Sequence, residues 1–320
     1  IVEKKTKNAQ LTELGKQLLE SGIEITDIMD RLTSEMLKTG KWREKKFRPY
    51  DIMINVPSIN IGKAQHYRAF LDQARQKFLS MGFTEMTGPI VETDFWDMDA
   101  LYMPQFHSAR DIHQAHYIKD PQYGELDEKL VNKVKQAHEN GLGTGSKGWQ
   151  YKFDTKRTHR LLLRTQGTAC SARKLASKDI NIPGKYFGIT RCFRYDVTDS
   201  THLADFTQIE GIVAEEGLNI RHLFGLLKMF AKEFADAEEI KIVPGYFPFT
   251  EPSAELFVKH PELGWVELGG AGIFRPEMTK PLGIDVPVIA WGLGIDRLAM
   301  CKLGIKDIRQ LYSQDLELLR

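Results

Sequence analysis

The chain has 320 residues, of which 42% are hydrophobic and 27% charged, and its formal net charge is +1. It can bury a large core, and its near-neutral charge excludes an overall field that would draw it onto nucleic acid, so any contact with RNA must come from a local basic patch or a partner. It has no apolar run near the roughly 20 residues of a membrane helix and no signal-peptide pattern. The three cysteines form no CxxC pair and no metal-ligand spacing, so we expect them to be small buried residues in a reducing compartment, the cytoplasm.

The sequence pattern predicts that residues 1–60 form a helical segment separate from residues 61–320. Leu11–Leu19 has the apolar spacing of an amphipathic helix, and a second helix begins near Leu32 with Thr33 as its N-cap. These helices alone cannot build a core, so we expect a solvated helical hairpin packed on the rest of the chain. Because the chain starts at Ile1 rather than methionine, we expect an N-terminally truncated protein.

The rest of the chain alternates helices with many short strands. Apolar spacing predicts a helix over Tyr67–Met81 that stops at Gly82, followed by a strand over 83–91 that Gly88 and Pro89 interrupt. A second helix is predicted over 218–234. Runs rich in β-branched and aromatic residues predict strands at 186–194, 206–214, 240–245, 254–259 and 265–269. Many strands with few intervening helices favour an α+β fold with a mixed but mainly antiparallel sheet flanked by helices.

Two arginines stand out as phosphate ligands. Arg194 lies in Arg-Cys-Phe-Arg-Tyr-Asp before a loop, and Arg297 ends Gly-Leu-Gly-Ile-Asp-Arg. A guanidinium binds phosphate oxygens bidentately and keeps its charge, so the pair suits two parts of one nucleotide. The chain has no GxxxxGK[ST] and no strand-linked GxGxxG, which excludes P-loop and dinucleotide-binding folds.

These segments resemble motifs 2 and 3 of the class II aminoacyl-tRNA synthetases. With Phe-Pro-Phe-Thr-Glu-Pro at 247–252 and Gly-Ala-Gly-Ile-Phe at 270–274, the chain from about Thr33 to Arg320 is similar to phenylalanyl-tRNA synthetase α subunits of the archaeal and eukaryotic type. The resemblance implies that residues 61–320 are the catalytic domain and 1–60 a remnant of a tRNA-contacting winged-helix region. It also implies that helix 67–81 and the following strand form a dimer interface.

The same resemblance implies ATP-dependent activation of phenylalanine and its transfer to tRNA-Phe, with Mg²⁺ as cofactor and a β subunit in an α₂β₂ heterotetramer. Arg194 would hold the α-phosphate and Arg297 the γ-phosphate. Asp196 and Phe206 would bind adenine, and Glu251 would bind magnesium through its hard carboxylate oxygen. The residues expected in the amino-acid pocket are Gln166, Thr168, Gln208, Ile209, Glu210, Phe247, Phe249, Ala271 and Phe274.

Three segments depart from the family pattern. Gln166 and Gly167 replace His and Thr, Thr207 replaces His, and Gln114-Ala115-His116 replaces Asp-Thr-Phe. We expect these positions to approach the amino-acid end of the site, so either phenylalanine remains the substrate or a paralogue has a retuned pocket. A catalytically silent, synthetase-derived binding module is a further alternative. His113 and His116 could suggest a metal site, but no third ligand has a suitable spacing.

Overall fold

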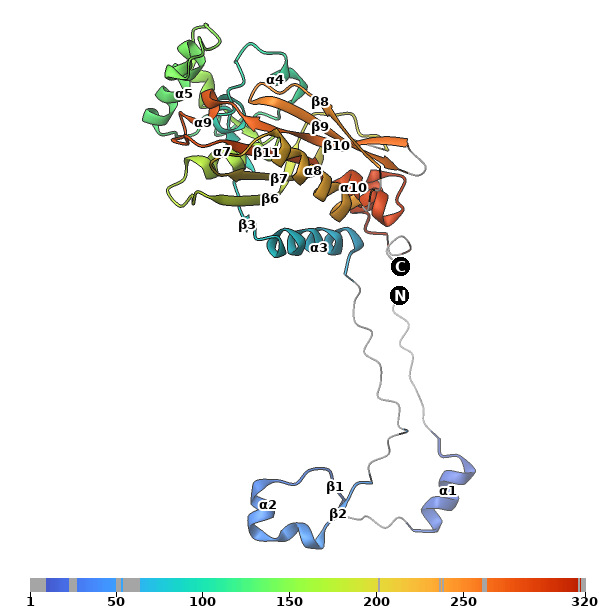
Figure 1. Ribbon diagram of the computed structural model, residues 1–320. Helices are drawn as coiled ribbons and strands as arrows, with labels where there is room; N and C mark the ends of the chain where they lie inside the picture. The colour runs from blue at the N-terminus through green and yellow to red at the C-terminus, as the bar shows by residue number, and fades with distance from the viewer. Residues whose placement is uncertain are drawn as a thin grey trace. The chain divides into compact units, whose positions relative to one another are not determined.

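The computed structural model describes residues 10–22, 28–49, 53, 64–200, 202–235, 237, 239–260, 264–315 and 317. The chain divides into two compact units, Ile1–Gly62 and Lys63–Arg320 (Figure 1). Among the described residues, no helix is both long and apolar enough to cross a membrane.

The first unit contains the two helices that the sequence predicts. Thr12 caps α1 (Glu13–Glu20), and Thr33 caps α2 (Ser34–Thr39) by accepting a hydrogen bond from Met36 N. Strand β1 (Ile28–Met29) pairs in parallel with β2 (Lys46–Phe47), and a 3₁₀ turn, η1 (Lys41–Glu44), precedes β2. Neither α1 nor α2 contains a buried residue.

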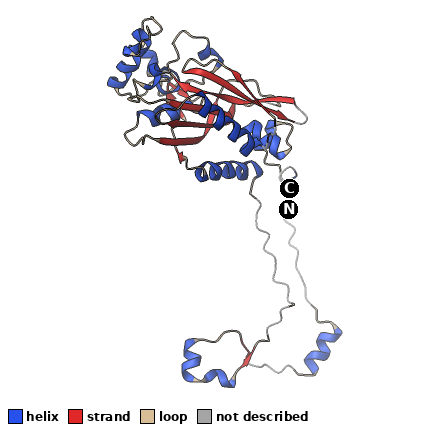
Figure 2. Ribbon diagram, viewed as in Figure 1, coloured by secondary structure: helices blue, strands red, loops and turns tan. Residues whose placement is uncertain are grey.

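The second unit is built on a seven-stranded sheet, seen in red in Figure 2. Its strands, in spatial order, are β3 (Thr84–Glu85), β6 (Gly184–Phe193), β7 (Asp205–Ala214), β11 (Val288–Gly294), β10 (Gly264–Phe274), β9 (Thr250–His260) and β8 (Ile240–Pro244). Only the β3–β6 pair is parallel. The expected α+β fold with a mainly antiparallel sheet is therefore confirmed.

The remaining elements of the second unit surround this sheet. The helices are α3 (His66–Ser80), α4 (Ala109–Ile112), α5 (Glu128–Asn140), α6 (Thr155–Thr158), α7 (Thr168–Ala176), α8 (Ile220–Ala235), α9 (Pro276–Thr279) and α10 (Ile295–Leu303). The same unit also contains a π turn, η2 (Phe95–Asp99), and two 3₁₀ turns, η3 (Gly141–Gly143) and η4 (Ile308–Tyr312).

The predicted strand over 83–91 is instead two separate strands. β3 joins the large sheet, whereas β4 (Val91–Thr93) pairs with β5 (Leu161–Leu163) in a small antiparallel sheet. Gly88 is held tightly at the break, because a Cβ there would lie 2.7 Å from Cys170 Sγ. Gly88 and Pro89 therefore mark the point where the chain passes from one sheet to another, not a turn within one strand.

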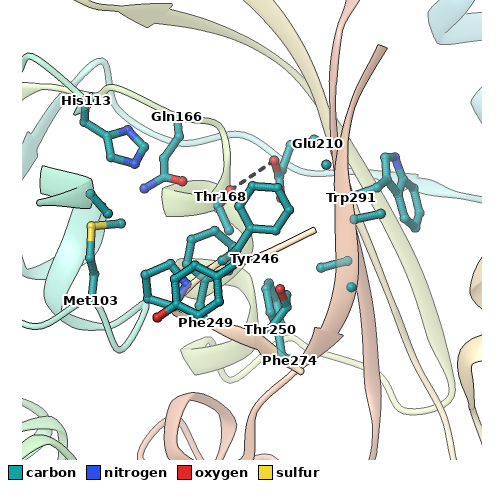
Figure 3. Close-up of a pocket in the computed structure, with 18 of the residues that line it drawn as sticks. Met103, His113, Gln166, Thr168, Glu210, Tyr246, Phe249, Thr250, Phe274 and Trp291 are labelled. Atoms are coloured by element: carbon teal, nitrogen blue, oxygen red, sulfur yellow. Dashed lines mark hydrogen bonds between the residues drawn. The ribbon is translucent and has the colours of Figure 1, made fainter. Parts of the chain in front are cut away.

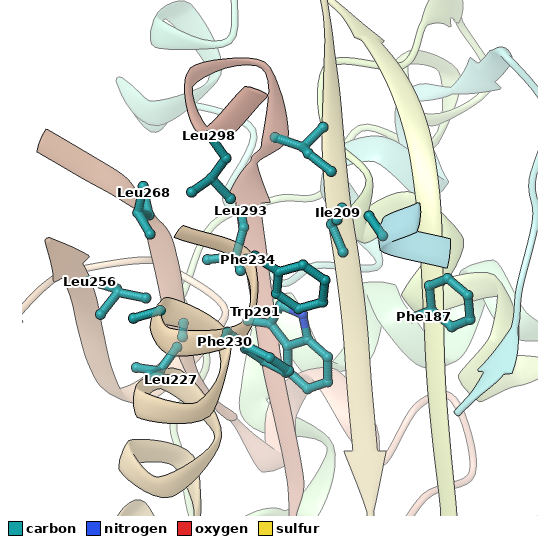
Figure 4. Packing of buried hydrophobic residues seen from close by; sticks show 14 of the residues in the cluster. Phe187, Ile209, Leu227, Phe230, Phe234, Leu256, Leu268, Trp291, Leu293 and Leu298 are labelled. Carbon is teal, nitrogen blue, oxygen red and sulfur yellow. The ribbon is translucent and has the colours of Figure 1, made fainter. Parts of the chain in front are cut away.

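Each face of the large sheet has its own hydrophobic core. On one face α3, α8 and α10 cover a cluster in which Phe78 stacks on Phe187 at 4.8 Å and on Phe234 at 4.9 Å between ring centroids. Figure 4 shows Trp291 packed beside Phe230, whose ring centroid is 4.8 Å away. On the other face, residues of α5, α7 and α9 form a second cluster. Side chains alternate along a strand, so the two faces receive alternate residues of β7.

Candidate active site

A cavity of about 480 Å³ lies against the sheet face that carries the second cluster. Its floor is formed by β7, β10 and β11, and its walls by residues 103–113, the start of α7 and the segment 246–250 (Figure 3). The volume falls within the range of small-molecule sites, about 300–1,000 Å³. The lining is mainly apolar with a few convergent polar groups, the composition that fixes the orientation of a small ligand.

The polar end of the cavity is built around Glu210 on β7. This buried carboxylate accepts hydrogen bonds from Thr168 Oγ1 and Ser171 Oγ, both at 3.2 Å. Burial raises its pKa from 4.5 to about 8, and the two hydroxyls offset part of that shift. Gly292 on the neighbouring strand leaves the acid accessible, because a Cβ there would lie 3.0 Å from Glu210 Oε2. Within the part of the chain that the structure describes, this acid forms no ion pair, and an ionised carboxylate of this kind suits an ammonium ligand.

Gln208 lies beside Glu210 on the same face of β7 and also lines the cavity. Its Oε1 accepts a hydrogen bond from Gly167 N at 2.9 Å. This bond leaves the Nε2 amide group directed toward Gly292, where a Cβ would approach it to 2.5 Å. A side-chain amide donor next to a carboxylate can bind the two ends of an amino acid backbone.

Aromatic rings form the apolar part of the cavity. Phe247 stacks on Phe249 with 5.9 Å between ring centroids, and Phe249 meets Phe274 edge-on at 6.3 Å. Two glycines on β10 create room for this cluster. A Cβ at Gly270 would lie 2.3 Å from Phe247 Cζ, and one at Gly272 would lie 2.4 Å from Thr250 Cβ. The arrangement fits an aromatic side chain, since rings favour stacked and edge contacts.

Arg194 also lines the cavity. Its guanidinium is 5.0 Å from the ring centroid of Phe206, and its Nε donates to Thr165 O at 3.3 Å. Burial lowers its pKa, but an arginine remains protonated at neutral pH. The structure thus brings the Arg194 guanidinium and the Phe206 ring together.

Two further residues that line the cavity, Gln166 and His113, carry neutral side chains and adjoin a buried acid. Gln166 donates from Nε2 to Asp97 O at 2.8 Å, and His113 Nδ1 lies 3.1 Å from Thr165 Oγ1. Burial lowers the pKa of His113 to about 3, so its imidazole is neutral, and burial raises the pKa of Asp97 to about 7. Among the described residues no group of three His, Cys, Asp or Glu side chains could hold a metal ion.

Several expected site residues do not line the cavity. Ile209 packs into the opposite core, because it alternates with cavity-facing neighbours on β7. Ala271 lines the cavity between Gly270 and Gly272 and also contributes to that core. Glu251 is exposed next to the cavity-lining Thr250. Asp196 lies half-buried in the loop after β6, outside the cavity.

Arg297 also lies outside the cavity, half-buried on α10. The residue before it, Asp296, is buried and joins three other elements. Asp296 accepts hydrogen bonds from Tyr67 OH on α3, from Thr207 N on β7 at 3.0 Å and from Tyr312 OH on η4 at 3.1 Å. This network fixes the first turn of α10 and with it the position of Arg297.

The three departures from the family pattern do not gather around the pocket. Gln166 lines it, but Thr207 points to the opposite face and lies 3.4 Å from Tyr312 OH. Gly167 is enclosed, since a Cβ there would lie 2.4 Å from Thr190 Oγ1 and 2.9 Å from Glu210 Cβ. Gln114 and Ala115 line a different hollow. The expectation that all three segments approach the cavity is therefore wrong for Thr207, Gln114 and Ala115.

Other residues of the cavity carried no role in the sequence reading. Met103, Tyr246 and Thr250 contribute side chains to it (Figure 3). Gly270, Gly272 and Gly292 contribute space. Glycines at i and i+2 in a strand were a usable signal, because such a pattern opens one face of a sheet to close approach.

The fold and the site define a class of protein. The family model for the tRNA synthetases class II core domain (F) matches residues 49–320, and the chain belongs to this family. A pyrrolysyl-tRNA synthetase structure from Desulfitobacterium hafniense is similar in fold, with a TM-score of 0.52 and 16% identity over 79% of this chain and 75% of that one.

Curated relatives share a more particular description. The chain is 54% identical over 320 residues to the "Phenylalanine--tRNA ligase alpha subunit" of Pyrococcus abyssi, and 58% identical over 291 residues to that of Thermococcus kodakarensis. The corresponding protein of Borreliella burgdorferi is 51% identical. These alignments cover 99%, 90% and 99% of this chain but only 64%, 58% and 60% of the relatives, so the chain spans less than two thirds of their length.

Proposed function

We propose that this chain is the catalytic α chain of a phenylalanine–tRNA ligase, which activates phenylalanine with ATP and transfers it to tRNA-Phe. The observation that carries the proposal is one cavity with three matched parts. An aromatic cluster around Phe249 receives the ring, the buried carboxylate of Glu210 receives the ammonium, and Arg194 faces the point where the carboxylate meets the nucleotide. The identity to relatives with this name supports the same activity.

The residues perform this chemistry by binding and alignment. A carboxylate oxygen of phenylalanine attacks the α-phosphorus of ATP, the bond to the bridging oxygen breaks, and pyrophosphate leaves with the electron pair. Arg194 offsets the charge that develops on the α-phosphate, while Phe206 and Asp196 hold the adenine and Arg297 the γ-phosphate. In the second step a ribose hydroxyl of tRNA attacks the carbonyl carbon, AMP leaves, and the hydroxyl proton passes to the leaving phosphate or to water.

Magnesium, the β subunit and the role of the first unit belong to the same proposal. Mg²⁺ would bind with the ATP phosphates and offset their charge, since the described residues provide no complete ligand set of their own. Glu251 would supply one carboxylate oxygen from its exposed position near the start of β9, next to the cavity-lining Thr250. We further propose an α₂β₂ heterotetramer with contact through α3, with residues 1–60 as the remnant of a tRNA-contacting region and 61–320 as the catalytic domain.

An ATP–pyrophosphate exchange assay with a panel of amino acids tests the activity. The chain, alone and with a β subunit, should support exchange with phenylalanine. Exchange with a different amino acid only would favour the paralogue, and absence of exchange in both preparations would favour the silent binding module. Gln166 is the one departure that lines the cavity, so Gln166→His is the variant that should change tolerance for tyrosine if the pocket has been retuned.

A further inference from the structure

Four acidic side chains are fully buried in one short stretch of the chain, on β4 and around the π turn η2: Glu92, Asp94, Asp97 and Asp99. A buried ionised carboxylate is costly unless a cation or hydrogen-bond donors compensate it. Two of the four meet the same cation, the guanidinium of Arg110, which is itself buried. Arg110 Nη2 donates to Asp99 Oδ1 at 2.5 Å, and Nη1 lies 3.7 Å from Asp94 Oδ1. Arg110 thus forms an internal ion pair with Asp99.

The guanidinium of Arg110 also bonds the backbone of the segment that precedes it. Its Nε donates to Pro104 O at 3.0 Å, and its Nη2, besides bonding Asp99, donates to Met103 O. These donors belong to one planar fork, a geometry that a lysine ammonium on a flexible stem does not reproduce. Arg110 therefore fastens two carbonyl groups of residues 103–110 to the last residue of η2.

The fastened segment is a wall of the cavity, whereas Arg110 lines the separate hollow. The lining residues of this wall are Met103, His107, Ser108, Ala109 and His113. The side chain of Met103 is fully buried in a small cluster with Met98 and Leu162, and Phe249 of the aromatic cluster packs against it (Figure 3). Movement of the Met103 backbone would therefore displace the support of Phe249, a ring of the proposed phenylalanine pocket.

Stability alone gives no reason for charges at this place. Replacing a buried ion pair by apolar side chains of similar volume is often neutral or stabilising. The compensation is also incomplete, because burial, and then the charge of Asp99, raise the pKa of Asp94 to about 6, although Arg110 and Arg157 offset part of the rise. What the fork of Arg110 supplies beyond charge is a fixed distance between η2 and the wall. Such π turns occur frequently at functional sites.

We propose that Arg110 is a positioning residue for the amino-acid substrate, which sets the affinity for phenylalanine by holding the cavity wall against η2. It acts through Met103 and Phe249 rather than by contact with the ligand. Loss of the fork lets segment 103–113 move, and a displacement of about 1 Å in a group that orients a substrate can cost on the order of 100-fold. The inference rests on the proposed activation of phenylalanine, and it assigns part of the selection of that substrate to a residue of the neighbouring hollow.

Pyrophosphate exchange with Arg110→Lys tests the proposal, because lysine keeps a cation beside Asp99 but not the fork. The KM for phenylalanine should rise at least about tenfold, while the KM for ATP and kcat stay within about threefold of the native values. A purely structural defect would instead lower the active fraction, and with it kcat, without a selective change in either KM. Arg173→Lys is the matched control, since Arg173 Nε and Nη2 both donate to another buried acid, Glu92, at 2.7 Å. It should leave both KM values unchanged.

A double variant covers the case in which Arg110→Lys does not fold. Asp99→Asn together with Arg110→Met removes both members of the ion pair, so that neither is left buried without its partner, and circular dichroism checks that the fold is retained. This variant should show the same selective rise in the KM for phenylalanine. An unchanged KM in either folded variant would overturn the proposal. Failure of both variants to fold would overturn it as well, because the pair would then be a requirement of folding.

Amide hydrogen exchange separates this inference from the proposed function, because the measurement needs no substrate. In Arg110→Lys the amides of residues 103–113 should exchange hydrogen at least about tenfold faster, and those of β7 at the native rate. Unaltered hydrogen exchange in residues 103–113 would overturn the positioning role, even where the native chain activates phenylalanine. Faster hydrogen exchange there, in a chain whose native form supports no pyrophosphate exchange with phenylalanine, would retain the role of Arg110 in the wall and overturn the proposed function.

Discussion

Binding of phenylalanine should strengthen steeply with pH because its ammonium partner is a protonated acid in the free site. The pKa of Glu210 is about 8, so at pH 6 only about 1% of the carboxyl groups are ionised, against about half at pH 8. An ammonium ligand binds the ionised form, and the apparent affinity is reduced by the fraction that is competent. The dissociation constant should therefore fall about 50-fold between pH 6 and pH 8, or about 2.3 kcal/mol.

Isothermal titration calorimetry with phenylalanine alone measures this effect. At pH 7 about 0.9 proton should be released per bound molecule, which two buffers of different ionisation enthalpy reveal. Glu210→Gln is the control, because it keeps an acceptor for Thr168 and Ser171 but cannot titrate. A pH dependence of the dissociation constant that remains in this variant comes from other groups, among them Asp97, whose pKa burial raises to about 7. A dissociation constant that changes less than about threefold in the native chain would refute the ammonium role of Glu210.

Four other outcomes are expected. The raised pKa of Glu210 makes its stabilising contribution complete below pH 4.5 and lost as the pH rises to about 8, so Glu210→Gln should flatten that part of the profile of unfolding free energy against pH in urea titrations. Gly270→Ala should displace Phe247, lower the free energy of unfolding by about 1–3 kcal/mol and weaken phenylalanine binding. Gly225→Ala on α8, where a Cβ meets no neighbouring atom, should instead raise the free energy of unfolding by up to about 1 kcal/mol. Equal melting temperatures for the two variants would contradict the steric role of Gly270. Arg297→Ala should raise the barrier to activation by about 2–4 kcal/mol, and an unchanged exchange rate would remove Arg297 from the site. Tyr312→Phe removes a donor to buried Asp296 and should cost about 1–3 kcal/mol in urea unfolding, which an unshifted midpoint would disprove.

Local patterns in the sequence were sufficient for most elements of the fold. Thr33 and Gly82 marked helix ends correctly, since a capping hydroxyl and a left-handed glycine act on the nearest backbone. The alternation of β7 was also present in the sequence, yet pattern alone did not tell which set of side chains meets the ligand. Gln208 and Glu210 were expected in the pocket together with Ile209, which the structure places in the opposite core.

Tertiary packing decided the remainder of the site. Gly167 looked like a position that had lost a hydroxyl, but Thr190 and Glu210 leave no room for any side chain there. Likewise Phe247 found its place only because Gly270, from a strand more than twenty residues later, lies opposite. Sequence by itself determined which residues share a strand face and which groups carry charge, because these depend on local geometry and chemistry. Which face is open, how deep the cavity is and how strongly Glu210 holds its proton depend on atoms brought together from distant segments, and only the folded chain determines those distances.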